Sequence, residues 1–147
     1  MGGGGKGGDG DEDIEVGDFE GEAKQVYVSI GGRLDSSAAW SSKETRTTVS
    51  VAAGDMDGDG DLDLAVGNYA GANQVYENLG GTLDSSPAWT STETVNTRSV
   101  AWGDMDGDGD LDLVVGHFLG EAHHVYENLG GSLYSSATWS SNETLHT

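Results

Sequence analysis

The ten residues DMDGDGDLDL occupy positions 55–64 and recur letter for letter at positions 104–113. Acidic side chains stand at the first, third, fifth, seventh and ninth places of each stretch, and a glycine stands at the sixth. From Leu62 onward, leucine and valine alternate with smaller or acidic residues, which is typical of a β-strand with one buried face. Each stretch therefore predicts an acidic turn that leads directly into a strand.

The same stretches anchor an internal repeat with a period of 49 to 50 residues. Each copy carries a Val-Tyr pair, then a Gly-Gly pair, a leucine and a tryptophan at matching intervals. In the three copies these are Val26-Tyr27, Val75-Tyr76 and Val125-Tyr126; Gly31, Gly80 and Gly130; Leu34, Leu83 and Leu133; and Trp40, Trp89 and Trp139. We interpret residues 1–147 as a single domain of three repeats, at about 1–48, 49–97 and 98–147.

Each repeat is expected to hold four antiparallel strands. In the second copy they fall on SVAAGD (50–55), the run that leaves the acidic loop, QVYENLG (74–80) and TLDSSPAW (82–89). The motifs at 41–44, 90–93 and 140–143 imitate helix capping boxes, but no apolar run of helical period follows them. Four antiparallel strands in a unit of this length describe a β-propeller blade, so the expected fold is all-β with three blades. The first blade has only a glycine-rich stub, residues 1–4, where its inner strand should begin.

The spacing of the acids suits a hard cation such as Ca²⁺, which takes 6 to 8 oxygen ligands in a tight loop bent at a glycine. An EF-hand would need a glutamate at the twelfth place, where Val66 and Val115 stand, and helices on both sides of the loop. The closing carboxylate is therefore expected at the ninth place, Asp63 or Asp112. Mg²⁺ prefers a smaller octahedral site, and zinc prefers nitrogen and sulfur.

The motif Asp-x-Asp-x-Asp-Gly-x-x-Asp, followed by LDLAVG or LDLVVG in a repeat of about 50 residues, resembles the FG-GAP and VCBS repeats of integrin-like β-propellers. The resemblance implies that each intact loop binds Ca²⁺ through four side chains and one backbone carbonyl. The implied ligands are Asp55, Asp57, Asp59 and Asp63 with the carbonyl of Asp61, and Asp104, Asp106, Asp108 and Asp112 with the carbonyl of Asp110. The first repeat departs from the pattern, because Gly5 and Gly7 leave only Asp9, Asp11 and Asp13.

Other polar and aromatic residues have competing interpretations. His117, Glu121, His123 and His124 could form a transition-metal or acid–base site, but polar residues at the matching places favour a local variation of a loop. The three tryptophans could stack on sugars, although packing between blades is favoured. The Ser pairs that recur in every repeat indicate turns, and no catalytic triad is visible. Asn142 begins a glycosylation sequon, Asn-Glu-Thr.

The chain is strongly acidic, with 26 Asp and Glu against six Lys and Arg and a formal net charge of −20. This balance argues against nucleic acid and anionic membranes as partners and favours cations. No apolar run approaches the roughly 20 residues of a membrane helix. The start MGGGGKGG lacks the apolar segment of a secretory signal, and the absence of cysteine leaves the redox compartment open.

These observations predict a non-catalytic, calcium-binding structural or adhesion module that is extracellular or on the cell surface. Propellers close with about 4 to 8 blades, so three blades predict self-association, either as a closed dimeric ring or as a surface fibre. Other copies of the chain are therefore the expected partners, together with glycans or surface proteins. The alternatives are a glycan-binding lectin propeller and a fragment of a longer VCBS-repeat surface protein.

Overall fold

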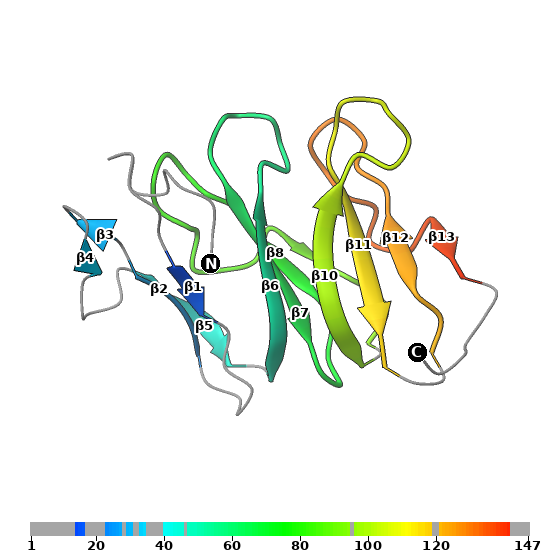
Figure 1. The fold of residues 1–147 in the computed structure, drawn as a ribbon, viewed down its shortest axis with the longest axis horizontal. Helices are drawn as coiled ribbons and strands as arrows, with labels where there is room; N and C mark the ends of the chain where they lie inside the picture. Colours follow the sequence, from blue (N-terminus) through cyan, green and yellow to red (C-terminus); the bar gives the residue numbers. More distant parts are fainter. Residues whose placement is uncertain are drawn as a thin grey trace.

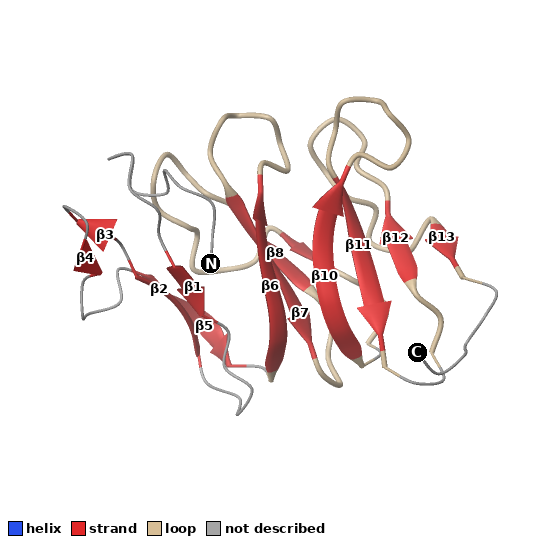
Figure 2. Cartoon of the chain, in the orientation of Figure 1, coloured by secondary structure: helices blue, strands red, loops and turns tan. Residues whose placement is uncertain are grey.

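The computed structural model describes residues 14–16, 23–27, 29–30, 33–34, 40–45, 47–94, 96–118 and 121–141. Every regular element within these ranges is a β-strand, as Figure 2 shows. The described part of the chain therefore contains no helix that is long and apolar enough to cross a bilayer. The all-β prediction is therefore confirmed.

Two four-stranded antiparallel sheets follow the order of the chain. The second blade contains β6 (Thr48–Gly54), β7 (Asp63–Asn68), β8 (Gln74–Tyr76) and β9 (Trp89–Thr90). The third blade contains β10 (Thr97–Gly103), β11 (Asp112–His117), β12 (His124–Tyr126) and β13 (Trp139–Ser140). Equivalent residues pair in both, since Gly54 lies opposite Asp63 and Gly103 lies opposite Asp112. These sheets confirm the predicted antiparallel, four-stranded blades.

The first blade has three strands among the described residues: β1 (Ile14–Val16), β2 (Ala23–Tyr27) and β5 (Trp40–Thr45). They align with the second, third and fourth strands of the other blades. A separate hairpin joins β3 (Ser29–Ile30) to β4 (Arg33–Leu34). The expected inner-strand stub, residues 1–4, lies outside the described residues.

The third and fourth strands are shorter than the sequence predicted. QVYENLG was expected to form a strand to Gly80, but β8 ends at Tyr76. Asn78 turns the chain there, because its side-chain oxygen accepts the Gly81 N–H at 2.7 Å and both following glycines have positive φ, 72° and 116°. Pairing resumes only as an isolated bridge from Asn78 to Leu83, and the last strand begins at Trp89.

The three sheets stand side by side in chain order (Figure 1), and the apolar core lies between them. One cluster joins the first and second blades and includes Val26, Trp40, Leu64, Val66, Tyr76 and Leu83. The other joins the second and third blades and includes Met56, Val75, Trp89, Val115, Tyr126 and Leu133. Because alternate residues of β7 enter different clusters, the second blade is buried on both faces.

Two of the three repeated tryptophans pack between blades, as predicted. The ring of Trp40 meets Tyr76 edge-on at 5.2 Å between centroids, and Trp89 meets Tyr126 at 5.0 Å. Both tryptophans are 8% exposed. Trp139 differs, because 54% of its surface is exposed.

Candidate metal site

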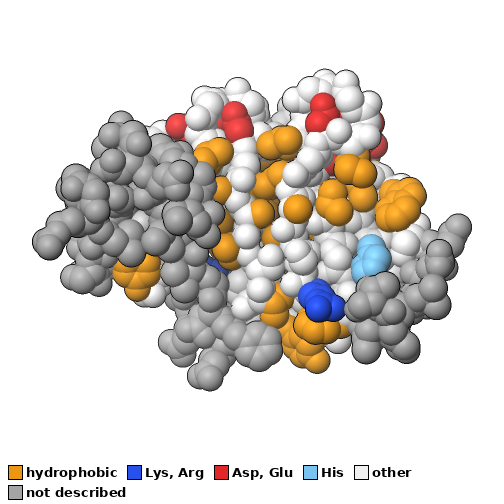
Figure 3. All heavy atoms as spheres, in the orientation of Figure 1, with side chains coloured by type: hydrophobic (Ala, Val, Ile, Leu, Met, Phe, Trp, Pro, Cys, Tyr) orange, Lys and Arg blue, Asp and Glu red, His pale blue; other side chains and the backbone are white. Residues whose placement is uncertain are grey.

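The two acidic loops connect the first and second strands of their blades, so β6–β7 and β10–β11 carry them to the same edge of the molecule (Figure 1). In the space-filling view, acidic side chains gather at this edge (Figure 3). The repeated strand register therefore brings both candidate sites to one side of the structure.

The loop of the second blade, residues 55–62, curls around the carboxylate of Asp55. One oxygen accepts the N–H groups of Gly58 at 2.8 Å and Asp59 at 3.2 Å, and the other accepts Gly60 at 2.9 Å. Gly60 has φ +91°, a left-handed conformation that glycine adopts without strain. The expectation of a bend at this glycine is confirmed.

Asp63 closes the loop from the first position of β7, and its side chain is fully buried. Its two oxygens accept the N–H groups of Met56 and Asn78, both at 2.8 Å. Burial raises the pKa of Asp63 to about 6, and the nearby charges of Asp57 and Asp59 also raise it, while the two N–H donors oppose the shift. The loop thus holds a desolvated carboxylate that a cation would favour in its ionised form.

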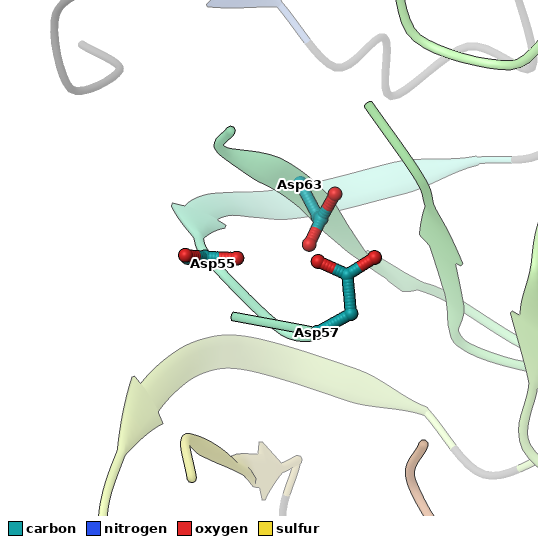
Figure 4. A group of neighbouring side chains, drawn as sticks. All are labelled: Asp55, Asp57 and Asp63. Carbon is teal, nitrogen blue, oxygen red and sulfur yellow. The ribbon is translucent and has the colours of Figure 1, made fainter. Parts of the chain in front are cut away.

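The structure brings the carboxylates of Asp55, Asp57 and Asp63 close together. One oxygen from each lies within 4.8 Å of the others, and Figure 4 shows the carboxylates of Asp57 and Asp63 pointing toward one another. Asp59 belongs to an overlapping group with Asp57 and Glu77. Asp61 is in neither group, and the sequence had assigned only its carbonyl oxygen to the ion.

The sequence interpretation missed Glu77. It follows β8 and approaches the loop from another part of the blade, where its hydrogen bond with Asp57 is the main cause of its raised pKa. The signal was present in the sequence, because both intact repeats carry Glu in VYENLG, at Glu77 and Glu127, whereas the first repeat has Val28.

The loop of the third blade repeats this scaffold. Asp104 accepts the N–H groups of Gly107, Asp108 and Gly109, and the hydrogen bond from Gly109 is the main cause of its lowered pKa. Asp112 is buried and accepts the N–H groups of Met105 and Asn128 at 2.8 and 2.9 Å.

The carboxylates of the third blade gather differently. The close group consists of Asp104, Asp106 and Asp108, all exposed, and Asp112 is not part of it. Asp110 turns one oxygen to the Gly130 N–H at 3.0 Å. Although Asp106 is exposed, partial desolvation by the surrounding loop and a hydrogen bond with Glu127 raise its pKa. The two loops have the same pattern of backbone hydrogen bonds to their first aspartate, but their carboxylates form different close groups.

Several predicted residues lie outside the described part of the chain. These are the acids of the incomplete first loop, Asp9, Asp11 and Asp13, and the sequon residue Asn142.

The histidine cluster has a structural explanation. The His117 ring bonds to the Ala122 carbonyl, and the His117 N–H donates to His123 Nδ1 at 3.0 Å. In the second blade, Asn68 makes both contacts, with Ala72 and Asn73. The histidines thus replace an amide network, and every group of three metal-ligating side chains among the described residues consists of carboxylates alone.

The donor set in each loop suits a hard cation. Several carboxylates approach one another, and backbone N–H groups fix Asp55 and Asp104 without using all of their lone pairs. Oxygen-only ligands on a flexible loop are the coordination that Ca²⁺ accepts and zinc does not prefer. The residues therefore fit a calcium ion.

Comparison with known protein families matches the chain to the family described as FG-GAP-like repeat. It matches twice, over residues 8–66 and 55–115, and together these ranges span well over half of the chain. A search of curated proteins finds no match.

Proposed function

Because the chain belongs to the FG-GAP-like repeat family, we propose that it is a calcium-binding, non-catalytic module that builds or decorates a cell surface. The observation that carries the proposal is the convergence of Asp55, Asp57 and Asp63 within 4.8 Å. Like charges at this separation repel strongly unless a cation or proton neutralises them. A bound Ca²⁺ would remove this repulsion and use the carboxylates as ligands.

Calcium binding would stabilise the fold. Two ions change the formal charge from −20 to −16, since each adds two positive charges. A site filled at a free calcium concentration of about 100 times its dissociation constant contributes about 2.7 kcal/mol to the free energy of unfolding. The loops would then act as structural joints between the first and second strands of each blade.

A melting experiment on the whole chain tests this proposal. We expect Ca²⁺ to raise Tm well above its value in chelator, and native mass spectrometry to count two ions. Mg²⁺ should protect much less, because it demands a smaller octahedral site and retains its waters. An unchanged Tm, or equal protection by Mg²⁺, would contradict a calcium-specific role.

The proposed location and partners follow from the same features. An extracellular or surface location would supply free calcium at the high concentrations that extracellular calcium-binding modules use. Trp139 is exposed, whereas the matching Trp40 and Trp89 are buried between blades, so we propose that the module self-associates through this face as a ring or a fibre. Surface localisation of the tagged protein, and its mass in solution with calcium, test these two points.

Glycan binding is the second candidate function. The observation that favours it is Trp139, which lines a cavity of about 380 Å³ together with polar side chains, an arrangement that suits a sugar ring. Binding on a glycan array that is lost in Trp139→Ala would support this alternative.

A further inference from the structure

The third blade exposes the face that the second blade buries. On the second blade, Met56 and Trp89 are 5% and 8% exposed. Their equivalents on the third blade, Met105 and Trp139, are 62% and 54% exposed and line the cavity of about 380 Å³. The same apolar surface is thus covered by a neighbouring blade on the second blade and is exposed on the third.

The third blade covers this face of the second blade, and their contacts define what a partner of the open face must supply. Trp89 packs edge-on against Tyr126, and its indole N–H donates to the Tyr134 carbonyl at 3.0 Å. The Asn128 side chain donates to the Met56 carbonyl at 2.7 Å. Trp40 and Tyr76 repeat the aromatic pair at the junction of the first and second blades. Each junction therefore sets the tryptophan of one blade against the tyrosine of the next.

The first blade carries the parts needed to cover the third. Tyr27 is the equivalent of Tyr76 and Tyr126 and is partly exposed. The hairpin of β3 and β4 pairs Ser29 with Leu34, in the register of the Asn128–Leu133 bridge that packs on the second blade. A second copy of the chain can therefore offer Trp139 a tyrosine and a hairpin of the same register as the one that covers the second blade.

Charge favours the first blade of a second copy as the partner of this open face, because the first repeat has a basic residue where the third repeat has a neutral one. Between the second and third blades, Ser132 lines a cavity with Asp57 and Glu77. The open cavity of the third blade is lined by the equivalent acids, Asp106 and Glu127. The repeat register places Arg33, one of only six basic residues, at the position of Ser132. The contact would thus bring a cation to an acidic rim.

We propose that the open face of the third blade binds the first blade of a second copy, head to tail. Trp139 packs on the partner's Tyr27, and the repeat register sets the partner's Arg33 at the acidic rim that Glu127 and Asp106 form. The inference rests on the proposed self-association and names its interface. Because the contact is heterologous, it closes into a ring of two chains or continues as a fibre, depending on the rotation between copies.

Complementary interface variants of the whole chain test the proposal. Arg33→Glu reverses the charge on the first-blade side of the contact, and Trp139→Glu places a charge on its third-blade side. With calcium, we expect each variant alone to be monomeric by analytical ultracentrifugation, with a dissociation constant raised at least about tenfold. Mixed together, they should form a 1:1 complex, because each supplies the surface that the other lacks.

Two further variants serve as controls. Arg33→Lys keeps the charge and should still associate. Arg98→Glu makes the same charge change on an exposed side chain of β10, away from the cavity, and should associate as the unaltered chain does. The calcium-dependent rise in Tm, measured on every variant, shows that each one folds and that its loops still bind the ion.

Three results would overturn the inference: a monomeric unaltered chain at micromolar concentration with calcium, association that survives both substitutions, or two monomeric variants that fail to combine. If calcium still raises Tm in any of these cases, calcium binding stands and only the interface is wrong. Absence of the calcium effect would instead reject the proposed function. Glycan binding by a monomer through Trp139 would assign the cavity to a sugar.

Discussion

Asp59 and Asp63 lie four residues apart in one loop but have different structural roles. Asp59 is exposed, and its side chain accepts the Asp61 N–H at 2.9 Å, a bond within the loop itself. Asp63 is buried and holds two backbone N–H groups from different parts of the blade. One residue therefore serves the proposed ion, while the other also serves the fold.

Alanine substitutions should separate these roles. Asp59→Ala is expected to remove about one bound ion and to leave Tm in chelator nearly unchanged. Asp63→Ala leaves the N–H groups of Met56 and Asn78 unpaired, at a cost of about 2–4 kcal/mol of unfolding free energy even without calcium. Calcium counting and chemical denaturation in chelator measure the two effects. Equal destabilisation by both substitutions would contradict this division.

The same comparison extends to the other loops. Asp108→Ala should also remove about one ion, because Asp108 belongs to the acidic group of the third blade. Asp9→Ala should remove little, because the first loop has glycines at the first and third places. Equal loss of calcium from all three variants would show that the first loop binds the ion as well.

Stability without calcium should depend on pH through Asp63. The pKa of Asp63 is about 6 in the folded protein, against 3.8 for an ordinary aspartate such as that of the unfolded chain. Between these values the folded chain binds a proton that the unfolded chain does not, so the stabilisation is complete below pH 3.8 and is lost as pH rises through about 6. In chelator, Tm should therefore be higher at pH 5 than at pH 7.

Calcium should reverse this trend, because the ion requires the ionised carboxylate. The rise in Tm that calcium produces is expected to shrink as the pH falls below about 6. Asp63→Asn is the matched control, since it removes the titrating group and should flatten the difference in chelator. An unchanged pH dependence in that variant would assign the effect to Glu77, whose pKa is also raised.

At the scale of strands, glycine permits the close approach of neighbouring blades. A Cβ on Gly67, in β7, would lie 2.7 Å from the Thr97 methyl carbon and 2.9 Å from a Val100 methyl carbon, both in β10. The equivalent glycine of the third blade, Gly116, has its nearest atoms at 4.0 Å. The same repeat position is thus closely packed in one blade and open in the other.

Gly67→Ala should cost about 1–3 kcal/mol of unfolding free energy, because β-branched Thr97 and Val100 have little rotamer freedom to move aside. Gly116→Ala should change stability by less than about 0.5 kcal/mol. Urea denaturation in calcium compares the pair. A smaller loss for Gly67 than for Gly116 would mean that the blades separate easily.

At the scale of the whole molecule, net charge opposes compaction. With a formal charge of −20, the folded chain repels itself more than the expanded chain does. Raising NaCl from about 0.1 M to about 1 M shortens the screening length from roughly 10 Å to 3 Å. In chelator, Tm should therefore rise by several degrees over this range, and by less once calcium is bound. A fall in Tm would show that charge repulsion does not limit stability.

Much of the fold could be predicted from the sequence because the information is local. Alternation of apolar and polar residues marks each strand, and the spacing of Asp and Gly marks each turn. The all-β class, the antiparallel blades and the position of the acidic loops between the first two strands of a blade therefore followed. The lengths of β8 and β9 did not follow, because Asn78 and its turn compete with strand pairing.

The sequence by itself determined the repeat, the strand order within a blade and the positions of the acidic loops, since each depends on neighbours along the chain. Only the tertiary structure decided which equivalent residues have different surroundings. Glu77 joins Asp57 and Asp59 across the blade, Asp112 stays apart from the exposed acids, and Trp89 is buried whereas Trp139 is open. The physical reason is that burial and charge depend on what packs against a blade, and identical repeats acquire different neighbours when they are stacked in a row.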